Sequence, residues 1–241
     1  MRQRIKTLTD HERHRTFGYR RIWALLRKAK VVINKKTVRL AMQDMGLSQP
    51  KIWHRPMRPK RVEKMRPQRP DQGWQIDMTS FPLSDFTPLF LVSIIDCCTR
   101  QIVGWTLDRR CRAGEWTAAV RTALESRGLM DKDACKALGL VLRSDNGSQP
   151  CSKKFVEFLG AHGIKGQYTG YDAPDDNAYI ERVFRTIKEE EIWPNLWDTL
   201  GEARAAIEAY VNYYNEERIH SSIDYQTPNE KAATFTTRVA A

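Results

Sequence analysis

The sequence predicts a mixed α/β protein in which a five-stranded sheet, flanked by helices, is preceded by a small basic helical module. Two observations predict this fold. From residue 73 onward, strand-like and helix-like segments follow one another, and the tight connection from Asp96 to Gln101 indicates that the first three strands form an antiparallel meander. Residues 1–70 hold 21 Lys and Arg against four acidic residues, a net charge of +17, whereas the remaining 171 residues carry a net charge of −6.

This charge asymmetry points to a polyanionic partner for the first module, most simply nucleic acid. A basic leader that only aids solubility is the alternative. Membrane and secreted proteins are excluded, because no stretch approaches the roughly 18–20 apolar residues of a membrane helix and the start lacks the apolar segment of a secretory signal. The five cysteines form no C-x-x-C pair and the histidines lack ligand spacing, which favours reduced thiols in a cytoplasmic protein without zinc.

The first module, residues 1–50, is expected to be a helix-turn-helix DNA-binding domain. One amphipathic helix is indicated by apolar side chains at i, i+3, i+4 and i+7: Tyr19, Ile22, Trp23 and Leu26. Asn34 is expected to cap a second helix that ends at Gly46. Three basic side chains near its start are candidates for DNA contacts: Lys35, Lys36 and Arg39. Any basic helical hairpin remains the alternative.

A linker is predicted for residues 51–72. The stretch 49–72 contains five prolines and eight Lys and Arg, so neither a regular helix nor a central strand is expected. An extended basic segment of this kind can follow a phosphate backbone. Its candidate DNA-binding residues are Arg58, Lys60 and Arg61.

The catalytic module is predicted over residues 73–216, and a tail over 217–241 is expected to pack on it. The expected strands are residues 74–80, 89–98, 101–108, 139–143 and 163–168. The expected helices are residues 113–126, 152–162, about 176–192 and about 200–215.

Three acidic residues stand out by their context: Asp77, Asp145 and Glu181. Asp77 interrupts an apolar strand, Asp145 ends another strand, and Glu181 lies on an amphipathic helix. A carboxylate among apolar side chains is costly unless it is paired or binds a cation. Converging carboxylates would suit Mg²⁺ or Mn²⁺, and two such ions about 4 Å apart can promote phosphodiester chemistry. The alternative is three unrelated structural or surface acids. Asp96 is expected to be a structural acid at a strand end, and Asn177 a helix cap.

The segments WQIDMTSF, LRSDNGSQ and DDNAYIERVFRTIKEE resemble the catalytic core of bacterial insertion-sequence DDE transposases, which is of the retroviral-integrase type (the integrase core domain family). There are 67 residues between Asp77 and Asp145 and 35 between Asp145 and Glu181, and the second spacing is typical of that superfamily. The segments FGYRRIWALLRKAKVVINKKTVRLAMQDMGL and AIEAYVNYYNEERIHSSIDYQTPNE are similar to the family's helix-turn-helix and closing segment. Departures are Pro150 and Cys151 after SDNGSQ and the loop 166–176.

The resemblance implies a ribonuclease-H-like fold and a polynucleotidyl transferase. It implies that Asp77, Asp145 and Glu181 are the catalytic, metal-binding triad for two Mg²⁺ ions, with Mn²⁺ as a substitute. Lys188 matches a basic residue near DNA, and Arg185 shares its helical face. The implied partners are transposon-end and target DNA and further copies of the chain, in the nucleoid of the bacterial cytoplasm. An upstream dimerising region, as a separate subunit or a fusion, is also expected. The alternatives are a transposase-derived DNA-binding regulator without catalysis and a ribonuclease H-type nuclease.

Overall fold

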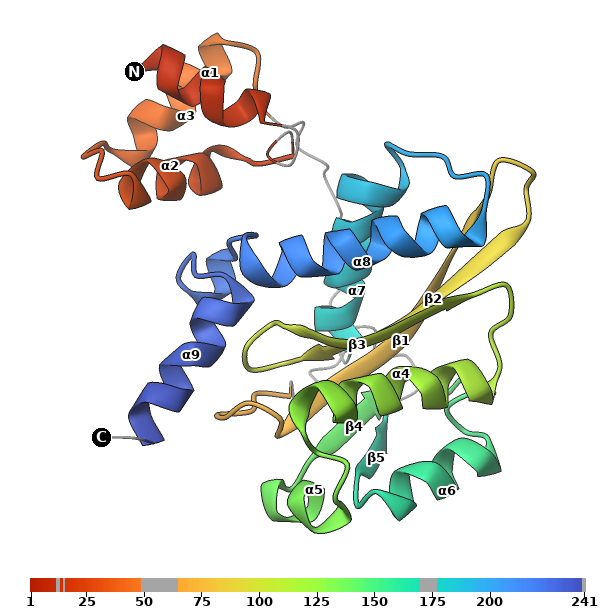
Figure 1. The fold of residues 1–241 in the computed structure, drawn as a ribbon. Coiled ribbons are helices and arrows are strands. Elements are labelled where there is room, and N and C mark those ends of the chain that lie inside the picture. The colour runs from red at the N-terminus through yellow and green to blue at the C-terminus, as the bar shows by residue number, and fades with distance from the viewer. Residues whose placement is uncertain (12–13, 15, 49–64, 170–176, 240–241) are drawn as a thin grey trace. The chain divides into compact units, whose positions relative to one another are not determined.

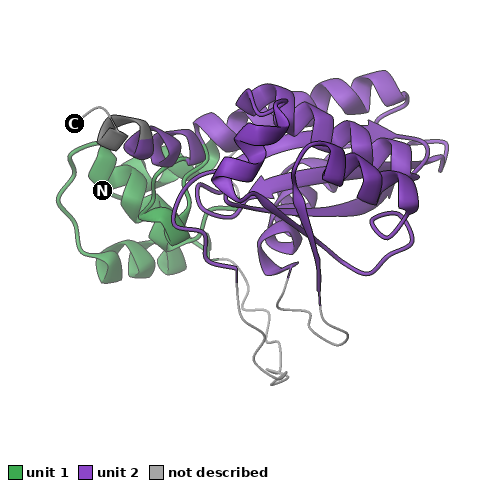
Figure 2. Ribbon diagram, turned by 90° about the horizontal axis from the view of Figure 1, so that it is seen from below, with its two compact units in different colours: residues 1–57, 218–227 green, residues 58–217, 228–241 purple. Residues whose placement is uncertain are grey.

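The computed structural model describes residues 1–11, 14, 16–48, 65–169 and 177–239. The chain divides into two compact units, which are described separately (Figure 2). Unit 1 comprises Met1–Met57 with Arg218–Thr227, and unit 2 comprises Arg58–Glu217 with Pro228–Ala241. The predicted DNA contacts Arg58, Lys60 and Arg61 and the loop after Thr169 fall outside the described residues.

The described part of unit 1 contains three α-helices, α1 (Arg2–Asp10), α2 (Tyr19–Lys28) and α3 (Lys35–Asp44). The expected pair α2 and α3 is confirmed, and so is the cap, because the Asn34 side-chain oxygen accepts a 2.8 Å hydrogen bond from the Lys36 amide. The indole N–H of Trp23 donates to the Ile33 carbonyl at 2.8 Å, which fixes the connection between the two helices. Helix α1 was not expected, since its sequence is largely polar.

The expected tail, residues 217–241, is divided between the two units. Within unit 1, Ile219 is buried in the apolar cluster of the three helices, and the ring of Tyr225 meets that of Trp23 edge-on at 6.1 Å. Helix α9 (Pro228–Val239) belongs to unit 2 and packs against α8 (Leu200–Glu216). The tail is therefore not a single segment on the catalytic module, because Ile219 is buried in unit 1 and Tyr225 packs, partly buried, against the same apolar cluster.

Unit 2 is built on the predicted five-stranded mixed sheet, with strand order β3-β2-β1-β4-β5. β1, β2 and β3 are antiparallel neighbours, whereas β4 pairs parallel to β1, and β5 pairs parallel to β4. The bounds are β1 Gly73–Pro82, β2 Pro88–Asp96, β3 Ile102–Asp108, β4 Val141–Ser144 and β5 Lys165–Tyr168.

Helices cover both faces of the sheet (Figure 1). One face packs against α4 (Ala113–Arg127), α5 (Lys132–Leu138) and α6 (Lys153–Ala161), and the other against α7 (Ala178–Ile187) and α8. Side chains alternate along β1, so Trp74 and Ile76 join the first layer while Phe81 joins the second. A Cβ at Gly104 of β3 would lie 2.4 Å from a backbone oxygen of α4, so glycine permits this close approach.

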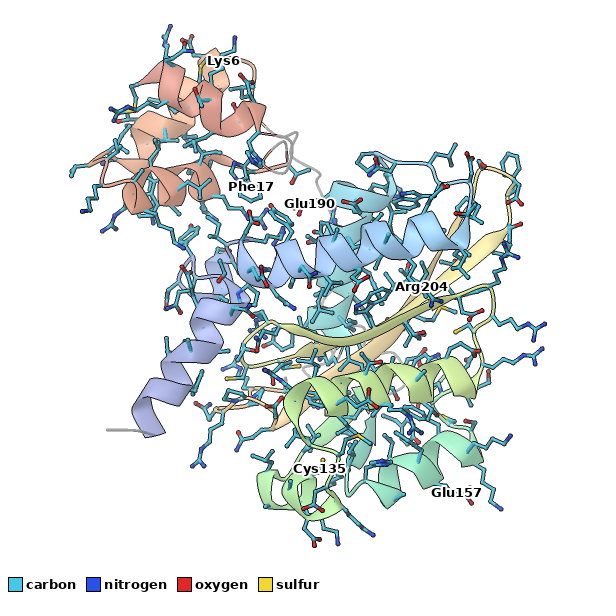
Figure 3. The ribbon with its side chains drawn as sticks, in the orientation of Figure 1. Lys6, Phe17, Cys135, Glu157, Glu190 and Arg204 are labelled. Carbon is cyan, nitrogen blue, oxygen red and sulfur yellow. The ribbon has the colours of Figure 1, made fainter. Side chains whose placement is uncertain are left out.

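The α8 layer is tied to the sheet by polar contacts as well as by apolar packing. The guanidinium of Arg204 donates to the Leu107 carbonyl of β3 at 2.8 Å, and Figure 3 shows this side chain reaching from α8 toward the strands. A second polar contact joins α8 to the segment that follows α7, because the Tyr210 hydroxyl donates to the Glu190 carboxylate at 2.8 Å.

The expected helix over residues 176–192 is shorter as an α-helix: α7 ends at Ile187 and continues as one π-helical turn, Lys188–Ile192. Helix α5 was not expected. No helix in the described part of the chain has the length and apolar character needed to cross a membrane.

Candidate active site

Asp77 and Asp145 lie on neighbouring strands. The parallel pairing of β1 with β4 runs from Gly73–Val141 to Gln75–Arg143. Extending this register by two residues sets Asp77 beside Asp145, the residue that directly follows β4. Two carboxylates with 67 residues between them in sequence are therefore brought to the same end of the sheet.

The loop after β4 leaves Asp145 exposed and holds its carboxylate. The Gly147 amide donates to the Asp145 carboxylate at 3.1 Å, and the Asn146 side chain donates to the Thr169 carbonyl beyond β5 at 2.6 Å. A Cβ at Gly147 would lie 3.1 Å from the same carboxylate oxygen, so a larger residue there would crowd Asp145. The sharp turn predicted from SDNG thus orients the carboxylate.

Glu181 lies exposed in the first turn of α7, whose start is held by β1. Asn177 occupies the cap position, but its side chain makes no capping hydrogen bond. Instead, the side-chain oxygen of Gln75 accepts hydrogen bonds from the amides of Tyr179 and Ile180, both at 3.1 Å. Gln75 is 1% exposed and stands two residues before Asp77, on the same face of β1.

The pKa of Asp77 on β1 is affected by the charges of both other carboxylates, Asp145 after β4 and Glu181 on α7. The pKa of Asp77 is raised to about 6: burial is the largest cause, a hydrogen bond from the Met78 amide lowers the pKa, and the negative charges of Asp145 and Glu181 raise it. Asp145 and Glu181 therefore both lie within electrostatic reach of Asp77. Among the described residues of both units, no three His, Cys, Asp or Glu side chains lie close enough together to enclose a metal ion.

The donor set nevertheless suits a divalent cation. Three carboxylates offer only oxygen ligands, which Mg²⁺ and Mn²⁺ prefer. The raised pKa of Asp77 reflects first its burial and then the nearby negative charges of Asp145 and Glu181, and a bound cation would offset both. Asp77, Asp145 and Glu181 are the residues that could hold such an ion.

Comparison with known proteins agrees with this geometry. The chain is 30% identical over 233 residues, 91% of its length and 88% of the relative's, to the transposase for insertion sequence element IS904 of Lactococcus lactis. The chain belongs to the insertion-sequence transposase family. It is also 28% identical over 242 residues to the putative transposase InsK for IS150 of Escherichia coli, covering 91% of this chain and 78% of that protein.

Family comparisons match both the first module and the catalytic module of this transposase. The Integrase core domain family matches residues 67–170 and again 162–228, and the HTH-like domain family matches residues 2–56. The catalytic core of BIV integrase superposes with a TM-score of 0.51 at 15% identity, covering 71% of this chain and 99% of that one. The HTLV-2 integrase core in complex with magnesium superposes with a TM-score of 0.51 at 18% identity, covering 69% of this chain and 99% of that one. These likenesses establish a ribonuclease-H-like fold for the transposase.

The predicted DNA contacts on α3 are exposed, but they differ in their surroundings. The Lys35 ammonium lies 4.2 Å from the centre of the Trp23 ring, so this lysine also joins α3 to α2. Lys36 and Arg39 are exposed, and neither forms an ion pair with the described residues.

The two predicted DNA contacts on α7 and the turn after it, Arg185 and Lys188, also differ. The Arg185 guanidinium forms an ion pair with Glu189 at 3.0 Å, four residues later on the helix. Lys188 is partly buried at the start of the π-helical turn and has no ion pair with the described residues.

The sequence reasoning missed two polar residues at the site. Gln75 could have been noticed, because alternation along the strand places it on the face of Asp77. Ser93 of β2 pairs directly with Asp77 in the antiparallel ladder, and its buried hydroxyl has no hydrogen-bond partner among the described residues. Asp96 is confirmed as a structural acid, since it accepts hydrogen bonds from the amides of Cys98 and Thr99 at 2.8 and 2.7 Å.

Proposed function

We propose that this transposase cuts DNA at the ends of its element and joins the cut ends to target DNA, with Asp77, Asp145 and Glu181 as its catalytic, metal-holding residues. The observation that supports this proposal is the raised pKa of Asp77, in which both other carboxylates take part. Bound Mg²⁺, two ions with Mn²⁺ as a substitute, would supply activation of the attacking oxygen and charge stabilisation of the leaving oxygen.

Both proposed steps are phosphoryl transfers. In the first, a water oxygen attacks the phosphorus at the element end, the bond to the 3′ oxygen breaks, and that oxygen takes up a proton. In the second, the resulting 3′-OH attacks a target phosphodiester, whose own 3′ oxygen leaves. Bonds are exchanged one for one, so neither ATP nor a covalent protein intermediate is required.

The chain's residues contribute position and charge. Gln75 holds the helix of Glu181 against the strand of Asp77, and Gly147 allows the turn that presents Asp145. Lys36 and Arg39 on α3, with Lys188 on the α7 side, would bind DNA phosphates. We further propose that the chain acts as a homo-oligomer on bacterial chromosomal DNA in the cytoplasm, with a dimerising region supplied by another subunit or a fusion.

The deciding experiment compares the wild-type chain with Asp145→Asn on end-labelled element DNA. For the wild type we expect Mg²⁺-dependent nicking that exposes a 3′-OH. In Asp145→Asn the nicking rate should fall at least a hundredfold, while the DNA affinity measured in a binding assay should not change. Near-normal nicking by Asp145→Asn would reject this residue's role. Metal-independent binding without any nicking by the wild type would support a regulator, and cleavage confined to RNA–DNA hybrids would support a ribonuclease H-type nuclease.

A further inference from the structure

Three arginines lie together where β3 leads into α4. Asp108 ends the strand and Ala113 begins the helix, so Arg109, Arg110 and Arg112 occupy a four-residue connection. All three side chains are exposed, and none forms an ion pair with a described residue. Two acids are near: the charge of Arg109 helps to lower the pKa of the exposed Asp85, and the Glu115 carboxylate accepts a 2.6 Å hydrogen bond from the Arg112 amide.

This connection is fixed beside the carboxylates. The Gln149 side chain, in the loop that follows Asp145, donates to the Cys111 carbonyl at 3.3 Å. The indole N–H of Trp116 donates to the Cys111 sulfur at 3.3 Å, which ties the same residue to α4. The negative charge of Asp77 is one of the causes that raise the pKa of Cys111, after burial, so Cys111 lies within electrostatic reach of Asp77. The arginines thus flank the site on an anchored backbone.

The arginines and Lys188 are carried by elements on different faces of the sheet. The β3–α4 connection leads to the layer of α4, whereas Lys188 follows α7 on the opposite face (Figure 1). These guanidinium groups are exposed, have no ion pair in the described structure and lie next to a site proposed to cleave phosphodiesters. They are suited to bind phosphate oxygens, because Arg binds phosphate through paired N–H donors. A protein partner is disfavoured because the fourth residue of the connection, Cys111, packs partly buried against the α4 layer, so the exposed side chains of the connection are the three charged ones.

We propose that Arg109, Arg110 and Arg112 form a phosphate-binding site that holds the DNA backbone next to the scissile phosphodiester, on the α4 side of the carboxylates. This inference rests on the proposed function, because it needs DNA at Asp77 and Asp145. The ligand is the sugar–phosphate backbone, so binding at this site carries no sequence preference.

The test uses the full chain with Arg109→Ala/Arg110→Ala. Arg112 is left in place because it is the residue that precedes α4. The matched control is Lys132→Ala/Lys136→Ala, which removes the same charge from exposed side chains of α5, the helix that leads into the opposite end of β4. The probe is a fluorescein-labelled duplex with the element end and its flank, intact or with single neutral methylphosphonates next to the cleavage site.

For the wild type and the control we expect one or two methylphosphonate positions to slow cleavage about tenfold. The arginine variant should be about tenfold slower on the intact duplex and insensitive to those same positions. Its slope of log Kd against log salt should be about 1.8 smaller, the value for two lost phosphate contacts. Arg109→Lys/Arg110→Lys should restore the slope.

Three results would overturn the inference: a wild-type rate and slope for the alanine variant, equal losses in the control, or methylphosphonate effects that persist in the arginine variant. If the alanine variant unfolds, the lysine variant and the methylphosphonate scan of the wild type decide, and a scan without any sensitive position rejects the site. A wild type that cleaves no DNA in Mg²⁺ or Mn²⁺ would overturn the proposed function instead, while the salt slopes would still decide the arginine site.

Discussion

Gln75 and Ile180 are joined by a 3.1 Å hydrogen bond in which the side-chain oxygen of Gln75 accepts from the Ile180 amide. The same oxygen accepts from the Tyr179 amide, so two otherwise unpaired N–H groups at the start of α7 are satisfied by β1. Glu181 is the next residue on the helix, and Asp77 is two residues farther along the strand. One buried amide side chain therefore ties the carriers of two candidate catalytic carboxylates to each other.

We expect Gln75→Met to impair cleavage more than folding. Methionine has a similar size but no strong acceptor, so the amides of Tyr179 and Ile180 lose their partner at a cost of about 1–3 kcal/mol in unfolding free energy. Displacement of Glu181 should raise the Mg²⁺ concentration needed for half-maximal cleavage about tenfold. Thermal unfolding and a Mg²⁺ titration at saturating DNA measure the two effects.

Gln75→Glu is the matched control, because its carboxylate can still accept both hydrogen bonds. It should keep the Mg²⁺ requirement closer to that of the wild type than Gln75→Met does. An unchanged Mg²⁺ requirement in Gln75→Met would show that the hydrogen bonds do not position Glu181.

The raised pKa of Asp77 predicts the direction of a pH effect on stability without metal. The folded-state pKa of about 6 exceeds the ordinary value of 3.8, so the contribution of Asp77 to stability is complete below about pH 4 and is lost as the pH rises through 6. Asp77→Asn should therefore unfold with about 1–3 kcal/mol more free energy than the wild type at pH 7.5. The gain should disappear at pH 4. Urea unfolding in EDTA at both pH values measures it, and a variant less stable than the wild type at pH 7.5 would contradict the prediction.

DNA binding by unit 1 is best tested on α3. Deleting residues 1–70 would also remove the partners of Ile219 and Tyr225, so its effect could not be assigned to DNA contacts. We expect Lys36→Ala/Arg39→Ala to reduce the slope of log Kd against log salt by about 1.8 and to leave single-turnover cleavage at saturating DNA unchanged. Fluorescence anisotropy measures the slope. The control is Arg4→Ala/Lys6→Ala on the exposed side of α1, and an equal loss there would show that only net charge matters.

The sequence was sufficient for features carried by local pattern. Alternating side chains indicated the strands, and the turn residues Asn146 and Gly147 indicated that Asp145 ends β4. The capping of α7 was not predictable, because it depends on a side chain about a hundred residues away in a different element. The split of the tail escaped prediction for the same reason: the burial of Ile219 depends on tertiary packing with α2 and α3, which periodicity does not encode.

Lys188, the first residue of the π-helical turn after α7, is the side chain of this helix that we expect to act on DNA. Glu181, Arg185 and Lys188 are spaced along one helical face, and Arg185 is already paired with Glu189. Exposed pairs of that kind contribute about 0.3–0.5 kcal/mol, so Arg185→Ala should change little.

Lys188 has no such ion pair among the described residues, and its ammonium can neutralise phosphates beside the scissile bond. We expect Lys188→Ala to leave the melting temperature unchanged and to slow strand transfer about tenfold, which corresponds to about 1.4 kcal/mol. Lys188→Arg, which keeps the charge, should recover most of the rate. Strand transfer by Lys188→Ala at the wild-type rate, with DNA saturating, would show that this lysine is only a partly buried surface residue.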